Sequence, residues 1–142
     1  MNLEKTFVAI KPDATSRRLI GVIIQRLEAT GLEMIGMKLL HVPRQTAEEH
    51  YSEHKGKSFF EDLVSFITSG PIVAMAWQGN HAIEIVRKIL GATDPVKAQP
   101  GTIRGDYGNS IEQNIIHASD SSASAARELK LFFPEGLIHI KR

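Results

Sequence analysis

One histidine of this chain stands in a setting that suits chemistry. His117 follows two isoleucines and precedes small polar residues in the run Asn114-Ile-Ile-His-Ala-Ser-Asp-Ser121. This pattern predicts a short strand ending near His117, and α/β sheets commonly bind ligands at strand ends. Ser119, Asp120 or Ser121 could cap the following helix, whose N-terminus offers free N–H groups. The alternative is a buried, hydrogen-bonded histidine beside a simple helix cap.

Three cationic residues could bind phosphate groups. Lys11 ends the first predicted strand, and Arg87 lies in the last turn of a predicted helix, where a cation also complements the helix dipole. Arg104 lies between glycines in Pro100-Gly-Thr-Ile-Arg-Gly105, a segment flexible enough to direct a guanidinium at a phosphate. Each could instead be a solvated charge. A nucleophile with several fixed positive groups is what phosphoryl transfer requires.

The composition narrows the candidate chemistry. The chain has 142 residues, no cysteine and six histidines, so a nucleophile must be His, Ser, Thr, Lys or a carboxylate. It contains no P-loop or dinucleotide-binding glycine motif, and no acidic cluster or spaced pair of histidines suggests a metal cage. The 42% apolar and 23% charged residues are typical of a globular chain, and the length suits one domain over residues 1–142.

The charge balance argues against a protein dedicated to polyanions. The 17 Lys+Arg and 16 Asp+Glu leave a net charge of +1, so we expect no dedicated nucleic-acid surface and no membrane attachment. The longest apolar runs, 19–24 and 71–77, are far shorter than the ~18 residues of a membrane span. The N-terminus also lacks the pattern of a signal peptide. We therefore expect a soluble, cytoplasmic protein.

Apolar periodicity predicts the elements that position these residues. Four strands are expected, over residues 5–12, 32–42, 72–78 and 115–119. Five helices are expected, over residues 18–30, 46–54, 58–68, 81–90 and 122–132.

Local signals add detail to these elements. Gly36 suggests an irregularity in the second strand. Thr46 and Glu49 suggest a capping box, and Asn80 suggests a helix cap. Residues 92–113, poor in apolar side chains, predict a long functional loop. The alternation indicates an α/β, or α+β, sandwich with one sheet face covered by helices.

The sequence resembles the nucleoside diphosphate kinases over essentially its whole length. Four segments carry the resemblance, in the family's order and spacing: Lys11-Pro-Asp13, Gly91-Ala-Thr-Asp-Pro95, Pro100-Gly-Thr-Ile-Arg104 and Asn114-Ile-Ile-His-Ala-Ser-Asp120. The resemblance implies a ferredoxin-like fold, a four-stranded antiparallel sheet with helices packed on it, in which loop 92–113 forms part of the nucleotide site. Ala14 and Ala118 stand where glycine is common in the family.

The resemblance also implies the reaction. The γ-phosphoryl group of a nucleoside triphosphate, usually ATP, would pass to a nucleoside diphosphate with low base specificity. His117 would be the nucleophile of a ping-pong reaction and carry the group as a phosphohistidine. Glu128 would orient its imidazole, and Ser119 would support that arrangement. Mg²⁺ would arrive on the nucleotide phosphates rather than in a metal site of the protein.

The family pattern further assigns the nucleotide contacts. Lys11 and Asn114 would hold the ribose hydroxyls, with Lys11 also near the transferred phosphate. Phe59 would stack on the base, with Ile111 on its other side, and such stacking tolerates any base. The other residues that match family positions around the phosphates and sugar are Tyr51, His54, Arg87, Thr93 and Arg104.

The oligomer and two other functions complete the expectations. The chain lacks the C-terminal extension of eukaryote-type hexameric members, so the resemblance favours a bacterial-type homo-oligomer, a tetramer over a hexamer. From the residues alone, a non-catalytic nucleotide or nucleic-acid binding module on the same kind of sheet stays open. So does a phosphocarrier that passes the phosphate of His117 to a protein. Such a carrier would need neither Phe59 nor Asn114.

Overall fold

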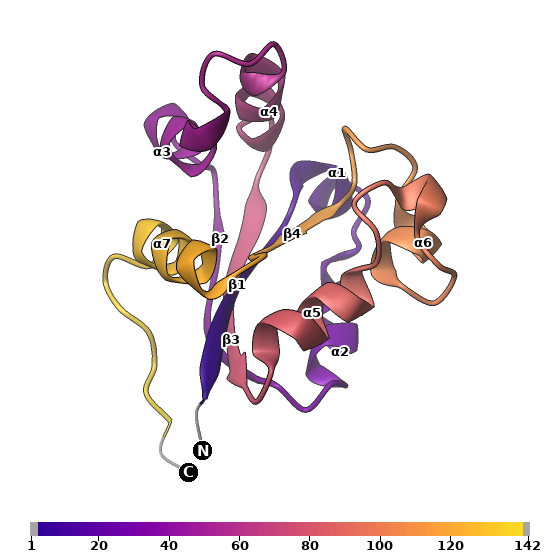
Figure 1. Cartoon of the computed structure of the whole chain (residues 1–142), viewed down its shortest axis with the longest axis vertical. Coiled ribbons are helices and arrows are strands. Elements are labelled where there is room, and N and C mark those ends of the chain that lie inside the picture. Colours follow the sequence, from indigo (N-terminus) through magenta and orange to yellow (C-terminus); the bar gives the residue numbers. More distant parts are fainter. Residues whose placement is uncertain (1–2, 141–142) are drawn as a thin grey trace.

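A four-stranded antiparallel sheet forms the centre of the computed structural model, which describes residues 3–140 (Figure 1). The strands are β1 (Glu4–Ile10), β2 (Glu33–Leu40), β3 (Ile72–Gly79) and β4 (Ile116–Ala118). Their order across the sheet is β2-β3-β1-β4, so β1 lies inside the sheet beside the short strand that carries His117. The expected ferredoxin-like α+β fold is confirmed.

Helices cover both faces of this sheet. They are α1 (Pro12–Ser16), α2 (Ile20–Glu28), α3 (Arg44–His50), α4 (Phe60–Ile67), α5 (Ala82–Leu90), α6 (Ile103–Tyr107) and α7 (Ser122–Phe132), with 3₁₀ turns η1 (Ser52–His54) and η2 (Pro95–Lys97). Figure 1 shows α2 and α5 on one side of the sheet and α7 on the other. The expectation that helices cover only one face is therefore wrong. Among residues 3–140, no helix has the length and apolar character to cross a bilayer.

Two hydrophobic clusters fill the space between the helices and the sheet. Successive strand residues point to opposite faces, so Phe7 and its neighbour Val8 are both fully buried, in different clusters. Val8 packs with Trp77 and with residues of α2 and α5, whereas Phe7 packs with residues of α3, α4 and α7. Each such side chain stabilises the fold by about 1.5–3 kcal/mol when it leaves water. These clusters fix β1, the strand that leads into Lys11.

The start of α3 differs from the sequence expectation. Thr46 and Glu49 have the spacing of a capping box, but α3 begins two residues earlier, at Arg44. The N-cap is Pro43, with the extended backbone (φ −63°, ψ 145°) that precedes a helix. Proline fixes φ near this value, so the backbone of Pro43 starts the helix without a side-chain cap.

The start of α5 shows a long-range substitute for a local cap. Asn80 does not cap the helix, which begins at Ala82. Instead, Oε1 of Glu4 accepts a hydrogen bond from the N–H of Ile83 at 2.9 Å.

Two other expectations are confirmed. Helix α7 spans residues 122–132, and the β2–β3 register shifts between Met34 and Gly36.

The excursion 92–113 is an ordered part of the fold rather than a structureless loop. It contains η2 and α6, and two arginines near α2 fasten it. Arg17 donates a hydrogen bond from Nη1 to the carbonyl of Tyr107 at 2.7 Å. Arg26 forms an ion pair with Asp106 (Nη2–Oδ2 2.7 Å) and lies over the Tyr107 ring, 5.1 Å from its centroid. The excursion therefore holds a fixed position beside the sheet.

Candidate active site

A strained turn precedes the strand that carries His117. Ile115 has a φ of +65°, in the left-handed region that β-branched residues rarely adopt. Its carbonyl accepts a hydrogen bond from the N–H of Lys11 at 2.9 Å, and its own N–H donates to Oδ2 of Asp13 at 3.1 Å. Backbone strain held by surrounding contacts is typical of functional sites. Here the turn places Lys11 beside β4.

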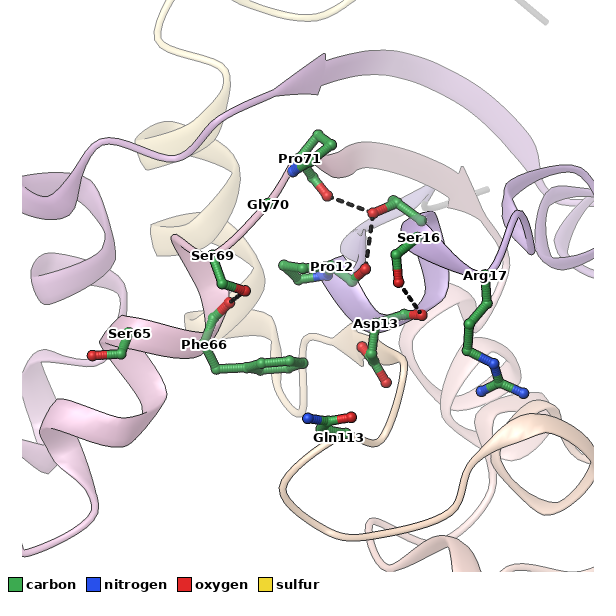
Figure 2. Close-up of a pocket in the computed structure, with 11 residues that line it drawn as sticks. Pro12, Asp13, Ser16, Arg17, Ser65, Phe66, Ser69, Gly70, Pro71 and Gln113 are labelled. Carbon is green, nitrogen blue, oxygen red and sulfur yellow. Dashed lines mark hydrogen bonds between the residues drawn. The ribbon is translucent and has the colours of Figure 1, made fainter.

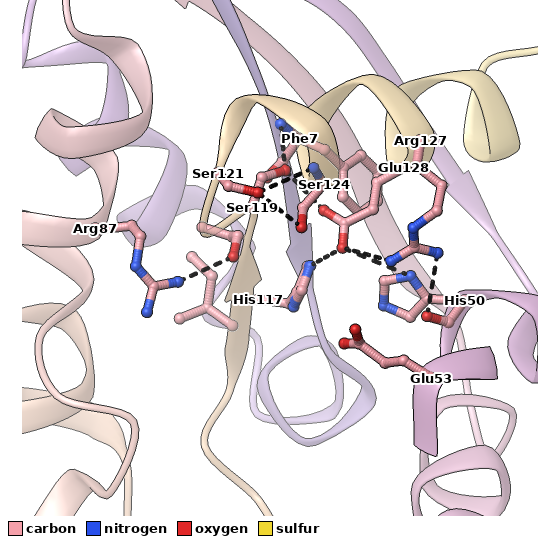
Figure 3. A network of polar contacts seen from close by, with 12 residues as sticks. Phe7, His50, Glu53, Arg87, His117, Ser119, Ser121, Ser124, Arg127 and Glu128 are labelled. Atoms are coloured by element: carbon pink, nitrogen blue, oxygen red, sulfur yellow. Dashed lines mark hydrogen bonds and ion pairs between the residues drawn. The ribbon is translucent and has the colours of Figure 1, made fainter. Parts of the chain in front are cut away.

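A chain of hydrogen bonds orients the imidazole of His117 (Figure 3). Its Nε2 lies 3.0 Å from Oε2 of Glu128, whose other oxygen accepts a hydrogen bond from Oγ of Ser119 at 2.7 Å. Oγ of Ser119 also accepts a hydrogen bond from the N–H of Phe7 at 3.2 Å. Helix α7 and strands β4 and β1 thus each supply one part of the chain.

The ionisation of Glu128 follows from these contacts. Burial acts to raise the pKa of Glu128, but the hydrogen bonds and charge of His117 and the hydrogen bond from Ser119 outweigh it, so the pKa lies below its ordinary value. An ionised carboxylate can only accept hydrogen bonds, so the proton of the neutral imidazole sits on Nε2 of His117. The lone pair is then on Nδ1, which no hydrogen bond from residues 3–140 reaches.

His50 and Tyr51 pack against this pair at the end of α3. The His50 and His117 rings meet edge to face, with centroids 4.9 Å apart. His50 is only 4% exposed, and its Nδ1 has no hydrogen-bond partner within the described part of the chain. Burial, followed by the charge of His117, lowers the pKa of His50 to about 3, so this imidazole is neutral at pH 7. Burial raises the pKa of Tyr51 to about 12, and Glu128 adds to the shift.

A cavity of about 280 Å³ lies beside His117. It brings together most of the residues that the sequence predicts for catalysis and phosphate binding. The residues that line it are Lys11, His50, Tyr51, Glu53, His54, Arg87, Thr93, Arg104, Asn114, His117, Ala118 and Asp120. They come from separate strands, helices and the 92–113 excursion, so only the folded chain assembles them.

Lys11 and Asn114 form a polar wall of the cavity. Nζ of Lys11 donates a hydrogen bond to Oδ1 of Asn114 at 2.8 Å, and Nδ2 of Asn114 donates to the carbonyl of Thr93 at 3.0 Å. Burial, reinforced by the charge of Arg104 and partly opposed by Asp13, lowers the pKa of Lys11 to about 8. An anion in the cavity would favour the protonated form of Lys11. This lysine is therefore poised to hold a negatively charged group.

Arg104 is not the solvated loop charge that the sequence left open as an alternative. It is 5% exposed and belongs to α6, and its guanidinium donates to three backbone carbonyls: Gly91 at 3.1 Å, Asn114 at 3.3 Å and Ile116 at 2.6 Å. Burial, together with the charge of Arg87, lowers its pKa to about 10, which leaves it charged at pH 7. Arg104 thus ties the excursion to β4 while it borders the cavity.

The residues predicted to hold the base lie outside the cavity lining. Phe59 is 44% exposed, and its ring centroid is 5.2 Å from that of His54, which does line the cavity. Its neighbour Phe60 packs against the core. Ile111 is 52% exposed and does not border the cavity. The structure therefore places Phe59 near one edge of the site and leaves Ile111 at the surface.

A larger groove, of about 880 Å³, runs between α1 and the end of α4 (Figure 2). Most of its residues are hydrogen-bonded to one another. Oγ1 of Thr15, for example, donates a hydrogen bond to the carbonyl of Pro71 at 2.7 Å. Arg17, on its rim, is bound to the carbonyl of Tyr107. The groove contains none of the residues predicted for catalysis. The groove is connected to the candidate active site through Asp13, whose Oδ2 accepts a hydrogen bond from the N–H of Ile115 in the strained turn.

The comparisons with known proteins agree with this geometry. Residues 4–138 match the family model described as nucleoside diphosphate kinase. The chain belongs to the nucleoside diphosphate kinase family. It is 56% identical over 133 residues to the enzyme of Carboxydothermus hydrogenoformans, covering 94% of this chain and 89% of that one. It is 54% identical over 138 residues to the enzyme of Methanocaldococcus jannaschii, covering 97% and 99%.

A solved structure supports the same assignment at the level of the fold. The Halobacterium salinarum nucleoside diphosphate kinase, a halophilic protein solved in complex with CDP, aligns with a TM-score of 0.95 and 50% identity, covering 99% of this chain and 95% of that one. As a member of this family, the chain is a kinase and a nucleotide-binding transferase of nucleotide metabolism. The binding-module and carrier alternatives are therefore not needed to explain it.

Sequence reasoning missed three residues of the site. His50 sits in an unremarkable helix, and only tertiary packing brings it to His117. Asp13 was noted for the family motif, not as the acceptor for Ile115. Arg127 lies 3.8 Å (Nη2) from Oε2 of Glu128. The only local signal for Arg127 is its position next to Glu128 on the helix.

Proposed function

We propose that the chain transfers the γ-phosphoryl group of a nucleoside triphosphate, with ATP as the usual donor, to a nucleoside diphosphate through a phosphohistidine on Nδ1 of His117. The observation that carries this proposal is the 3.0 Å contact between Nε2 of His117 and Glu128, beside a cavity lined by cations. The contact keeps the proton on Nε2 and leaves the Nδ1 lone pair available as a nucleophile.

The reaction then has two matched halves. Nδ1 of His117 attacks the γ-phosphorus, the bond to the bridging oxygen breaks, and the nucleoside diphosphate leaves with that oxygen. A terminal oxygen of a second nucleoside diphosphate attacks the phosphorus, and the P–N bond returns its electron pair to Nδ1. The imidazole is positively charged while it carries the phosphoryl group, and the carboxylate of Glu128 stabilises that charge. Ser119 keeps the carboxylate oriented.

Three cationic side chains stabilise the phosphates. Arg87 and Arg104 border the cavity, Arg104 remains charged at pH 7, and Lys11 gains charge when an anion is bound. The contacts to the phosphates and the sugar also include Thr93, Tyr51 and His54. The ribose hydroxyls bind Asn114 and Lys11. Phe59 stacks on the base, and Ile111 reaches its other face only if the surface segment around it moves inward.

Magnesium fits this site as a companion of the nucleotide. The cavity is lined by three cations and by only two carboxylates, Glu53 and Asp120, so its charge suits phosphate oxygens better than a bare divalent ion. When bound on the nucleotide, Mg²⁺ neutralises part of the phosphate charge. The side chains of Lys11, Arg87 and Arg104 hold the phosphates in line with His117.

We further infer that residues 1–142 act as one kinase domain in a homo-oligomer, a tetramer in preference to a hexamer. The edge strand β2 supports association, because Met37 and Leu39 point to the same side of it and are 55% and 66% exposed. Light scattering coupled to size-exclusion chromatography measures the oligomer directly. A monomer or a hexamer would contradict the inference.

Trapping the intermediate tests the function. The full chain is mixed with γ-labelled ATP and Mg²⁺, quenched, and examined for label that is acid-labile and alkali-stable, as a phosphohistidine is. We expect up to one label per chain and its release by any nucleoside diphosphate. Label that persists undiminished in His117→Ala would sink the assignment. Exposed His41→Gln is the matched control and should label normally.

A further inference from the structure

Folding creates a cluster of metal-ligand types that the sequence does not show. His50 Nδ1 and His117 Nε2 lie 4.0 Å and 3.0 Å from the same oxygen, Oε2 of Glu128. One ligand atom from each of the three residues lies within 4.8 Å of the others. No spaced pair of histidines in the sequence marks this cluster, because its residues are separated along the chain and meet only across α3, β4 and α7.

The chemistry of this donor set differs from that of a magnesium site. Two imidazoles and one carboxylate are a common ligand set for zinc with an open fourth position, whereas Mg²⁺ prefers oxygen ligands. Zinc ligand atoms in a tetrahedral site lie about 3.3 Å apart, from Zn–N distances near 2.0–2.1 Å. The three atoms must therefore approach by up to about 1.5 Å from their spacing of at most 4.8 Å.

A second observation points to a missing partner. Nδ1 of His50 is buried and makes no hydrogen bond within residues 3–140, although buried polar atoms normally have a partner. His50 and His117 both border the cavity, so the cluster lies at its wall. Arg127, 3.8 Å from Oε2, is the nearest competing cation.

We propose that His50, His117 and Glu128 bind one Zn²⁺ ion and that the bound ion switches off the nucleophile. Coordination occupies the lone pair of Nε2 on His117, so the proton of the neutral imidazole must move to Nδ1. Nδ1 then has no free lone pair with which to attack phosphorus. The inhibitory part of this proposal rests on the proposed function, whereas the zinc site itself does not.

Direct titration tests the site without nucleotide. Metal-free full-length protein is titrated with Zn²⁺ alone, and we expect one ion per chain. His50→Gln should weaken binding at least about tenfold, because it removes a ligand. His41→Gln, an exposed histidine outside the cluster, should leave the affinity unchanged. Arg127→Gln should tighten binding, because it removes a neighbouring positive charge. Equal affinity in wild type and His50→Gln overturns the proposal.

Two further measurements keep the test independent of folding defects and of the kinase assignment. If His50→Gln does not fold, His50→Cys, which offers a sulfur ligand, should retain zinc binding. In wild-type protein, ¹⁵N shifts of the histidine rings should change at His50 Nδ1 and His117 Nε2 when zinc is added, and unchanged shifts overturn the site. One equivalent of Zn²⁺ should block labelling by γ-labelled ATP, and a chelator should restore it. If metal-free protein never labels yet zinc binds these nitrogens, the proposed function and the inhibitory part of this proposal fail, and the zinc site stands.

Discussion

The two ends of the active site are built in opposite ways. At the chemical end, His117, Glu128 and Ser119 are joined by side-chain hydrogen bonds of 2.7–3.0 Å, and Glu128 and Ser119 are buried. At the proposed base end, Phe59 and Ile111 are 44% and 52% exposed, and neither borders the cavity. In the proposed reaction, the protein thus orients the nucleophile by itself, whereas the nucleotide must complete the base site.

This difference has a physical reason. Aiming a lone pair at phosphorus requires a fixed ring and a fixed proton position, which only buried partners supply. A site that accepts several different bases needs a flat contact without buried polar groups. Buried polar groups would favour the base that pairs with them and reject the others. The cations between the two ends are also fixed, since Arg104 bonds three backbone carbonyls and Lys11 bonds Asn114.

Glu128→Gln should break the chemical end and have the largest effect. The amide retains the shape but not the charge, so it no longer stabilises the positive imidazole, and we expect kcat to fall by about 10²–10³-fold. KM for the nucleotide should change little. Steady-state kinetics check this, with the exposed Glu84→Gln as the control. A kcat within a few-fold of wild type would show that the carboxylate charge is not used.

Arg104→Lys should disturb the fixed cation that lies between the two ends of the site. Lysine cannot bond the carbonyls of Gly91, Asn114 and Ile116 together, so we expect kcat/KM to fall by about 10²-fold. The free energy of unfolding should fall by roughly 2–4 kcal/mol, because buried carbonyls lose their donor. Kinetics and urea unfolding measure both effects. Arg44→Lys, in an exposed ion pair with Glu61, should leave the free energy of unfolding nearly unchanged.

Phe59→Ala should affect the base end alone. Loss of one stacking contact is worth about 1–3 kcal/mol, so KM should rise roughly tenfold while kcat stays the same. The rise should be similar for adenine, guanine, cytosine and uracil nucleotides. Val96→Ala, which removes apolar surface from a residue that is 80% exposed and not part of the cavity lining, should leave KM unchanged. An unchanged KM in Phe59→Ala would favour a carrier that does not hold the base.

The smallest effect concerns pH. The pKa of Lys11 is lowered to about 8, so its charge is lost as the pH rises through that value. We expect kcat/KM, which reports the free enzyme, to fall about tenfold between pH 7 and pH 9. Lys11→Gln should have a lower kcat/KM without this step. A profile that is flat in wild type, or a step that persists in the variant, would assign the titration to another group.

Stability should show the opposite trend in the same pH range. Between pH 8 and the ordinary lysine pKa of 10.5, the unfolded chain binds more protons at Lys11 than the folded chain does. The free energy of unfolding of wild type, measured relative to Lys11→Gln, should therefore rise with pH across this window. Urea unfolding of the two proteins at three pH values checks the sign.

The sequence by itself determined most of the elements and singled out the proposed nucleophile. Apolar periodicity located all four strands, and the cap and period of α7 gave its range, because both signals are local. The segments around Lys11, Arg104 and His117 carry the family pattern, so the candidate catalytic residues could also be predicted. The starts of α3 and α5 could not be predicted, because Pro43 and the distant Glu4 replace the local caps.

Only the tertiary structure decided which groups meet. Arg104 looked like a solvated loop arginine, but its environment depends on carbonyls 10 to 13 residues away along the chain. His50 carried no local signal, yet it packs against His117 because α3 crosses the same sheet face as α7. Burial and contact distances, and hence the pKa values and the zinc-ligand cluster, depend on packing between distant segments. Side-chain type and spacing along one chain do not contain that information.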